Sequence, residues 1–270
     1  MSLGKALVDE INAAKIDAGT GAFWWLGQLG FAIKIAGKKL YFDPYLFEGG
    51  ERLHPPIFKP EDVTGADIIF GSHDHIDHID HSCWPKLAKA SPEAVFVCSK
   101  AHVEKLSKEF EIDIDRFVGM NDGERVTVKG IEINAIAAAH EFIERDPVTG
   151  YCPHLSFVVK ADEKAFYFSG DSCIYDGYTS KIDALGHLDL MIVPINGRDA
   201  YRYRTECWGN MTFQEAVDLA GTLKTSFVVP AHYEMFAYNS EDPKKFVQYL
   251  NIKYPEIKTW VGVYGERVDF

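Results

Sequence analysis

Apolar residues follow two different spacings along the chain, and the change between them divides it into expected helices and strands. Near the N-terminus the spacing is that of an amphipathic helix, whose apolar side carries Leu3, Leu7, Ile11 and Ala14. From Phe23 to Leu46 apolar and polar residues alternate, which predicts strands at 31–36 and 39–43 joined by the turn "AGKK". The Gly- and Pro-rich segment 47–60 predicts a loop.

The rest of the chain predicts a strand-rich part followed by alternating helices and strands. A buried strand at 66–72 precedes helices at 82–90 and 100–110, which flank a strand at 94–99. Further strands are expected at 125–128, 131–140, 154–161 and 164–172. Helices at 177–186, 212–224 and 242–254 then alternate with strands at 188–196 and 226–233. This order indicates an α/β protein with two sheets packed face to face and helices outside.

The helix expected at 212–224 has the clearest signals of the set. Thr212 and Glu215 have the spacing of a capping box, in which each side chain binds the other residue's backbone N–H. Its buried side is expected to carry Phe213, Ala216, Val217, Ala220 and Leu223. No repeat, low-complexity tract or linker divides the chain, so residues 1–270 are expected to form a single domain.

Composition and charge narrow the class of protein. The formal net charge is −12 and no run of basic residues is longer than two, which argues against a nucleic-acid partner. No apolar stretch approaches the roughly 20 residues that span a bilayer, and the N-terminus lacks the apolar core of a signal peptide. The five cysteines form no CxxC pair, as expected of reduced thiols. We therefore expect a cytoplasmic protein with no membrane partner.

The stretch "GSHDHIDHIDH", residues 71–81, is the strongest chemical signal in the chain. His73 and His75 are two residues apart beyond an apolar strand, so an extended backbone points both imidazoles the same way. Asp77 and His78 follow where a helix is expected to begin. A single histidine is more often structural, but imidazoles and carboxylates at this density are typical of a divalent metal site.

Three more residues that can bind metal stand at the ends of apolar strands. His140 ends "INAIAAAH", Asp171 ends "FYFSGD" and His232 ends "FVVPAH". Each alone is weak evidence, but the ends of neighbouring strands converge on one edge. The full set has seven members, more than one ion needs and suited to two. It consists of His73, His75, Asp77, His78, His140, Asp171 and His232.

The chain resembles the metallo-β-lactamase-fold hydrolases from "YFDP" to "PAHY". The resemblance implies a four-layered αβ/βα sandwich with two divalent ions. It assigns one ion to His73, His75 and His140 and the other to Asp77, His78 and His232. Asp171 would bridge the two ions, and Asp43 would support the metal loop from outside the ligand set. Asp77 and Asp171 are the expected catalytic residues, since the ions would hold a hydroxide that Asp77 orients.

Further details point to one branch of these hydrolases. His75 stands where the oxygen-reducing di-iron relatives have glutamate, which favours hydrolysis over redox chemistry. Asp171 stands where the antibiotic-degrading lactamases have cysteine. "NGR", "GNMT" and "PAHY" resemble the L-ascorbate-6-phosphate lactonases. This resemblance implies a small anionic, phosphorylated sugar-type lactone or ester as substrate, manganese as the metal and a homo-oligomer. Histidine-rich sites also bind zinc, so Mn2+ and Zn2+ both stay open.

The expected substrate contacts come from the segment that follows the strand at 188–196. Arg198, Arg202 and Arg204 could bind a phosphate or carboxylate through their guanidinium groups. They could equally form salt bridges with Asp199 and Glu206. Tyr233 is a further candidate for the pocket wall. The histidines without a strand-end position are expected to be structural, and these are His54, His81, His102, His154 and His187.

Two alternatives to this hydrolase remain open. One is a phosphodiesterase of the same fold, such as the RNA-processing relatives, against which the acidic charge argues. The other is a metal-binding subunit without catalytic activity. Against it stands the complete ligand set, because a degenerate member would be expected to lose one or more ligands.

Overall fold

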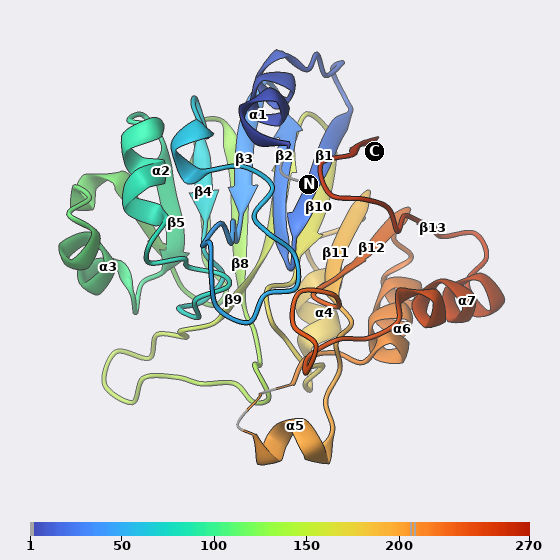
Figure 1. Cartoon of the computed structure of the whole chain (residues 1–270). Coiled ribbons are helices and arrows are strands. Elements are labelled where there is room, and N and C mark those ends of the chain that lie inside the picture. Colours follow the sequence, from blue (N-terminus) through green and yellow to red (C-terminus); the bar gives the residue numbers. More distant parts are fainter. Residues whose placement is uncertain (1–2, 206, 208) are drawn as a thin grey trace.

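Across the described residues, 3–205, 207 and 209–270, the strands of this computed structural model form two seven-stranded mixed sheets (Figure 1). The first sheet has the order β14 (Arg267–Asp269), β1 (Gly21–Gly27), β2 (Gly30–Ile35), β3 (Lys38–Phe42), β4 (Ile68–Phe70), β5 (Val95–Ser99), β6 (Phe117–Met120). The second has the order β13 (Lys258–Thr259), β12 (Phe227–Ala231), β11 (Leu190–Pro194), β10 (Lys164–Phe168), β9 (Leu155–Ala161), β8 (Ile131–Ala137), β7 (Arg125–Val128).

Helices cover the outer face of each sheet and so complete four layers (Figure 1). The first sheet is covered by α1 (Gly4–Ala13), α2 (Trp84–Ala90) and α3 (Val103–Phe110). The second is covered by α4 (Tyr178–Asp183), α6 (Phe213–Leu223) and α7 (Pro243–Lys253). The short helix α5 (Ala200–Arg204) projects from the lower end of the molecule in Figure 1, and the 3-10 turns are η1 (Pro60–Asp62) and η2 (Ile114–Arg116). The predicted α/β sandwich is confirmed.

Aromatic rings from both sheets fill the space between them. Phe42 and Phe70 of the first sheet stack with their centroids 4.0 Å apart. Phe42 also lies 4.8 Å from Phe168, and Phe70 lies 5.4 Å from Phe157, both in the second sheet. Buried aromatic rings supply much of the apolar area that stabilises a core. The two sheets therefore form a rigid base for the loops at the strand ends.

Three details of the predicted helices and strands differ in the structure. Leu3 is 45% exposed, so it does not belong to the buried side of α1. The helix expected from residue 100 begins at Val103, because the His102 N–H still donates to the carbonyl of Ser99 in a turn. The pattern missed α5 and strands β6, β13 and β14, whose two to five residues are too short to show a period.

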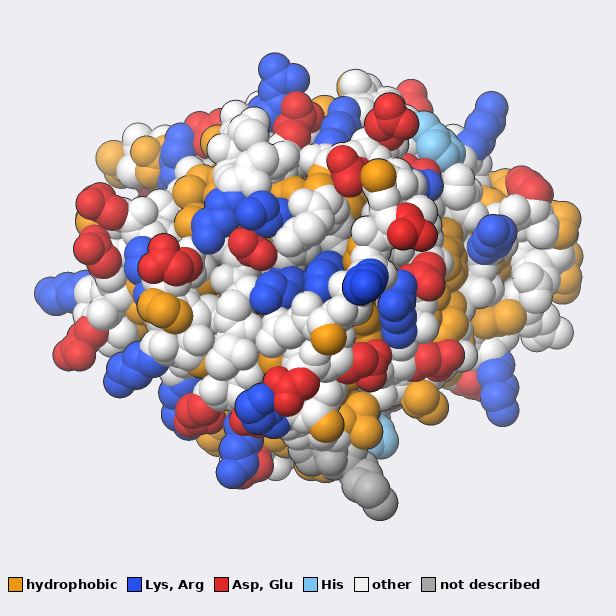
Figure 2. Space-filling model, turned by 90° about the horizontal axis from the view of Figure 1, so that it is seen from above, with side chains coloured by type: hydrophobic (Ala, Val, Ile, Leu, Met, Phe, Trp, Pro, Cys, Tyr) orange, Lys and Arg blue, Asp and Glu red, His pale blue; other side chains and the backbone are white. Residues whose placement is uncertain are grey.

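The two ends of the sandwich differ in character. The parallel strands β8, β10, β11 and β12 run in one direction, so their carboxyl ends meet at one end of the molecule (Figure 1). The face at the top of Figure 1 carries lysine and arginine side chains interspersed with aspartate and glutamate (Figure 2). That face is not a basic surface of the kind that binds nucleic acid. Among the described residues, no helix combines the length and apolar character that crossing a bilayer requires.

Candidate metal centre

The histidine-rich motif directly follows β4, and its chain turns back on itself after His75. The N–H groups of His78 and Ile79 donate to the carbonyl of His75, at 3.0 and 2.8 Å. This tight turn sends Asp77 and His78 toward the same space as His73. The helix expected to begin here starts only at Trp84, so a turn and not a helix positions these two residues.

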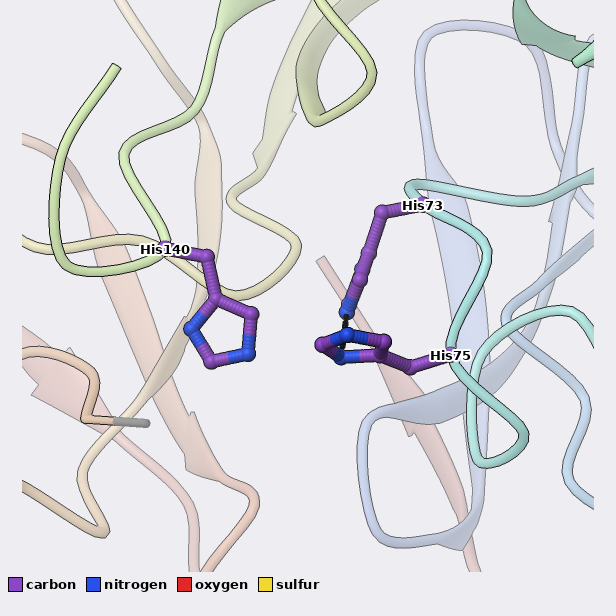
Figure 3. Close-up of side chains that lie close together, drawn as sticks. All are labelled: His73, His75 and His140. Atoms are coloured by element: carbon purple, nitrogen blue, oxygen red, sulfur yellow. Dashed lines mark hydrogen bonds between the residues drawn. The ribbon is translucent and has the colours of Figure 1, made fainter. Parts of the chain in front are cut away.

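One group of potential ligands consists of His73, His75 and His140 (Figure 3). The Nε2 atom of His73 and the Nδ1 atom of His75 are 2.9 Å apart. His140, three residues beyond β8, brings its ring from the second sheet, and the three ligand atoms lie within 4.8 Å of one another. The structure thus brings together three side chains that span 68 positions of sequence, from His73 to His140.

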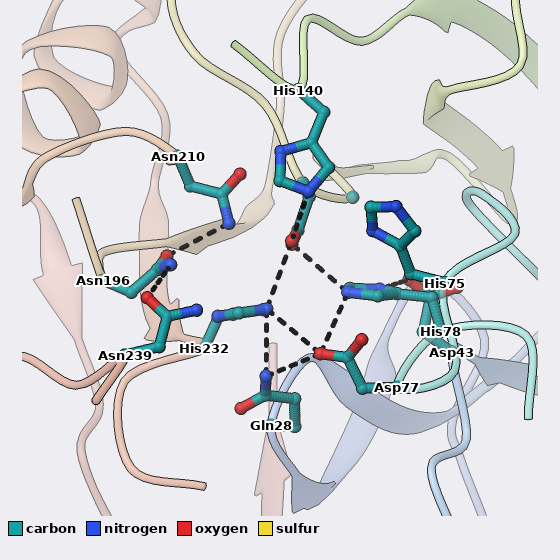
Figure 4. A network of polar contacts seen from close by, with 12 residues as sticks. Gln28, Asp43, His75, Asp77, His78, His140, Asn196, Asn210, His232 and Asn239 are labelled. Atoms are coloured by element: carbon teal, nitrogen blue, oxygen red, sulfur yellow. Dashed lines mark hydrogen bonds and ion pairs between the residues drawn. The ribbon is translucent and has the colours of Figure 1, made fainter. Parts of the chain in front are cut away.

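A second group consists of Asp77, His78 and His232 (Figure 4). Asp171 lies between the two groups. The Nε2 atoms of His78 and His232 are 3.5 and 3.4 Å from Oδ2 of Asp77. Asp171 reaches both groups with one oxygen, since its Oδ2 is 3.6 Å from Nε2 of His140 and 3.2 Å from Nε2 of His232. Its Oδ1 is 3.4 Å from Nε2 of His78.

Four of these five separations, at 3.4–3.6 Å, fit shared ions better than they fit direct hydrogen bonds. Two ligand atoms bound about 2.0–2.2 Å from one tetrahedral ion lie roughly 3.3–3.6 Å apart, whereas N–H···O bonds are usually about 2.7–3.2 Å long. The Nε2 atom of His78 and Oδ1 of Asp171 are both buried and have no hydrogen-bond partner. Buried polar atoms without partners are rare because they are costly. A divalent cation between them would satisfy both.

Asp43 and Ser72 fix the orientation of two of the histidines. Oδ2 of Asp43 accepts from Nδ1 of His78 at 2.6 Å and from the Ser72 hydroxyl at 2.6 Å. The Ser72 hydroxyl also lies 3.0 Å from Nδ1 of His73. With the Nδ1 nitrogens occupied in this way, the Nε2 lone pairs of both histidines point into the site. The place predicted for Asp43 fits the structure, whereas Ser72 was missed although it directly precedes His73.

Gln28 is a second residue that the pattern did not reveal. It sits in the turn between β1 and β2, and its Nε2 lies 2.8 Å from Oδ2 of Asp77 and 2.9 Å from Nε2 of His232. Gln28, Asp43 and His232 all have positive φ angles, of 55°, 39° and 58°. Non-glycine residues in this region are strained, and such strain concentrates at functional sites. A glutamine in a tight turn carries no sequence signal of this role.

Burial and charge divide the histidines into two classes. Burial lowers the pKa of His73 well below its usual value, and it lowers the pKa of His140 to about 4. Both imidazoles are therefore neutral at pH 7 and have a free lone pair. Burial acts in the same direction on His78 and His232, but the carboxylates of Asp171 and Asp77 outweigh it. The pKa of His78 is raised well above its usual value and that of His232 to about 10.

The pKa values of the two neighbouring carboxyl groups shift downward. Burial alone would raise the pKa values of Asp77 and Asp171, but the neighbouring His78 and His232 hold both well below the usual range. Without a metal, protons on these two histidines compensate the two buried negative charges. A divalent cation would supply the same positive charge at the same place.

A cavity of about 740 Å³ opens directly over the two groups. Five of the seven predicted ligands line it, namely His75, Asp77, His140, Asp171 and His232. The volume is typical of a pocket for a small molecule. The centre is thus accessible to a substrate from one side, while Asp43, Ser72 and Gln28 lie buried below it.

The predicted arginines lie differently from the expectation. Arg198 donates through both Nη atoms to Glu215, at 2.7 and 2.6 Å, and Arg202 donates from Nε to Asp199 at 2.8 Å. Neither Arg198, Arg202 nor Arg204 lines the cavity. The alternative of a salt-bridged loop therefore describes Arg198 and Arg202 better, although Glu206, one of the partners considered, lies outside the described residues. Arg204 is exposed on α5.

Tyr233 and the other histidines complete the account of the predicted residues. Tyr233 packs against Trp25, with the ring centroids 5.4 Å apart, and does not line the cavity. His81 lies between Asp74 and Glu109, His102 binds the carbonyl of Pro153 and His187 binds Ser226, as expected of structural residues. His154 is closer to the centre than expected, because its ring lies 5.0 Å from that of His73 and 5.7 Å from that of His140.

Known proteins share both the sequence pattern and the fold. Residues 36–233 match the family profile described as "Beta-lactamase superfamily domain". The chain is 26% identical to a UPF0173 metal-dependent hydrolase of Caldivirga maquilingensis, in an alignment covering 91% of this chain and 96% of that protein. It is 29% identical to a UPF0173 metal-dependent hydrolase of Pyrococcus abyssi, covering 85% and 92%. The solved structure of Igni18, a metallo hydrolase of Ignicoccus hospitalis, shares the fold with a TM-score of 0.71 and 22% identity, covering 93% and 98%.

Proposed function

The chain belongs to the beta-lactamase superfamily, and from this membership together with the geometry of the centre we propose that the protein is a metal-dependent hydrolase with a dinuclear site. The observation that carries the proposal is the position of Asp171. A single carboxylate oxygen faces His140 of one group and His232 of the other, at 3.6 and 3.2 Å. A bridging carboxylate is what holds two ions at a fixed separation.

The ligand types leave the metal open between Zn2+ and Mn2+. Neutral imidazoles such as those of His73 and His140 suit zinc, and carboxylates such as Asp77 and Asp171 suit both ions. When bound, a pair of divalent ions lowers the pKa of water from about 15.7 to near 7 and polarises a carbonyl or phosphoryl oxygen. That chemistry supports hydrolysis at neutral pH without a serine or cysteine nucleophile.

The residues of the chain supply orientation and a proton acceptor. Gln28 donates to Oδ2 of Asp77 at 2.8 Å and so fixes the rotation of that carboxylate. Asp77 lines the cavity, where it can accept a proton from an attacking water. His75 is exposed to the same space and Asp171 lies below it. An ester or lactone carbonyl that enters the cavity would meet these groups first.

The lining of the cavity does not favour the phosphorylated sugar lactone that the sequence resemblance implies. Binding of a phosphate group away from the reacting carbonyl usually requires arginine or lysine. Arg198 and Arg202 are paired with Glu215 and Asp199, and neither lines the cavity. We therefore propose hydrolysis of a small lactone or ester, with the metals as the binding site for any anionic group next to the carbonyl.

The proposal is tested by metal removal and reloading. The chelated protein is assayed before and after addition of Zn2+ or Mn2+, against γ- and δ-lactones, p-nitrophenyl esters and bis(p-nitrophenyl) phosphate. We expect two ions per chain and metal-dependent cleavage of lactones or esters. Cleavage of the phosphodiester alone would favour a phosphodiesterase, and a fully loaded protein that cleaves none of them would favour a non-catalytic subunit.

A further inference from the structure

Apart from the potential ligands, eleven of the described residues line the cavity over the centre, and five of them are aromatic. The rings come from three separate segments of the chain: the loop after β3, helix α5 and the loop after β12. These side chains are Tyr45, Phe47, Tyr201, Phe236 and Tyr238, with Ile76 beside them. Their shared feature is an apolar surface turned toward the space where a substrate would lie.

Several of these side chains are exposed in a way that a folded protein usually avoids. Ile76 is 58% exposed, Tyr201 70% and Tyr238 46%, and all three line this one cavity. Exposed apolar groups that cluster around a pocket mark a binding surface, because leaving them in water brings no stability. Something apolar is expected to cover them when the site is occupied.

Two of the aromatic residues that line the cavity belong to a buried cluster. Tyr45 and Phe236 are buried and form a small core with Met235, separate from the two main cores. The ring of Phe236 lies 6.2 Å from that of Tyr45 and 5.7 Å from that of Tyr238, so the contacts run from the buried core to the exposed rim. Phe236 therefore connects Tyr238 to the buried cluster, while the side chain of Tyr238 stays partly exposed to the cavity.

The residues that line the cavity do not favour an anionic group held away from the metals. Among its described lining residues there is no lysine and no arginine, and Glu51 adds an acidic side chain to the rim. An anion held away from the metals would lose water without gaining a cationic partner, and it would be repelled by Glu51. An uncharged apolar group in the same place would have neither this desolvation cost nor this repulsion.

From this lining we propose that the substrate is an uncharged ester or lactone that carries an apolar group of the size of an aromatic ring. The carbonyl lies over Asp77 and Asp171, and the ring packs on Phe236 and Tyr238. This assignment rests on the proposed hydrolase function for the carbonyl, but the aromatic contact itself is independent of turnover. A cavity of about 740 Å³ has room for both parts.

The test uses a matched series of γ-lactones and their non-hydrolysable lactam analogues. The ring carries a phenyl group, a phosphomethyl group or no substituent, and lactam binding to the metal-loaded protein is measured by calorimetry. We expect the phenyl lactam to bind at least about tenfold more tightly than the phosphomethyl lactam. Tyr238→Ala should weaken the phenyl lactam by about two- to tenfold, the range expected for one aromatic pair, and Tyr238→Phe should restore its binding.

Ile252→Ala is the control, since Ile252 is an exposed apolar residue on α7 that does not line the cavity. Equal or tighter binding of the phosphomethyl lactam, or equal losses for all three lactams in Tyr238→Ala, would overturn the inference. Failure of the hydrolase proposal has a different signature. In that case the phenyl lactam still binds through Tyr238, but none of the lactones is cleaved.

Discussion

At the scale of single residues, Asp171 connects the two halves of the centre. Its Oδ2 faces His140 and His232, and its buried Oδ1 has no hydrogen-bond partner. Asp171→Asn keeps the shape but removes the charge that would compensate two cations. We expect the loss of about one ion per chain and a fall in turnover larger than the roughly 10- to 100-fold effect of residues outside the ligand set. Elemental analysis and turnover on the best lactone or ester measure both.

The same variant separates a bridging carboxylate from a structural one. The far-ultraviolet circular dichroism spectrum should match that of the parent protein, because the sheets do not depend on this side chain. An Asp171→Asn protein that retains both ions and full turnover would show that Asp171 does not bridge.

Asp43 acts one step further out, through His78 and Ser72. Asp43→Asn weakens the acceptor for the Nδ1 proton of His78, so that histidine loses part of its orientation and basicity. We expect metal affinity to fall by about 10- to 100-fold, measured by competition with a chromogenic chelator.

Asp80 provides a matched control for this change. It is equally buried and belongs to the same motif, but it accepts from the backbone of Leu46 and Phe47 and not from a histidine. Asp80→Asn should lower thermal stability while keeping metal affinity within about threefold, less than the outer-shell range. If both variants lose affinity alike, Asp43 merely maintains the loop.

At the scale of helices and strands, the positions of the candidate ligands could be predicted because the ends of the strands could be predicted. Apolar runs set the strands β8, β10 and β12, and the polar residues His140, Asp171 and His232 follow them within one to three positions. The supporting residues were not predictable in this way. Gln28 lies in a turn and has a positive φ angle where it contacts Asp77. Neither the composition nor the spacing of apolar residues predicts such a backbone conformation at a glutamine.

The arginine segment shows the opposite failure. Three arginines in an acidic chain suggested an anion site, yet Arg198 binds Glu215 in the first turn of α6. The capping box of Thr212 and Glu215 at the start of α6 was predicted and is confirmed, with the Thr212 N–H donating to Glu215 at 2.9 Å. What the sequence could not show is that Glu215 serves this box and Arg198 together.

This shared role predicts a pH dependence of stability. Burial would raise the pKa of Glu215, but the hydrogen bonds from Arg198 and Thr212 outweigh it and lower the pKa. A carboxyl with a lowered folded-state pKa adds stability above its unfolded pKa, near 4.3, and loses that contribution as the pH falls through the folded value. Glu215→Gln should therefore cost about 1–2 kcal/mol at pH 7, and the difference should shrink below about pH 4.

Urea unfolding of the two proteins at pH 7, 5, 4 and 3 measures this difference. Glu256→Gln, at an exposed position outside the helices and strands, controls for the loss of one carboxylate. A Glu215→Gln deficit that stays constant across this range would mean that shape, and not charge, explains the loss.

At the scale of the whole molecule, the centre joins the two sheets. His73, His75, Asp77 and His78 follow β4 of the first sheet, whereas His140, Asp171 and His232 follow strands of the second. The interior between the sheets is apolar and closely packed, but at this end it stops at a cluster of buried charges. Ions held from both sides would act as cross-links between the two layers, in addition to hydrogen bonds such as that from the Leu155 N–H to the carbonyl of Ser72.

Metal loading should therefore raise the stability of the molecule as a whole. Ligands that bind only the folded state stabilise it by about 2.7 kcal/mol per site at a free concentration 100 times Kd. For a chain of this size, one kcal/mol corresponds to roughly 2–4 °C in Tm. Calorimetry of the chelated and reloaded protein should thus show an increase of at least about 5 °C that grows with metal concentration. Hydrogen exchange should slow on both sides of the interface, after β4 and after β12. Protection confined to one sheet, or a Tm independent of metal, would mean that the ions do not join the two layers.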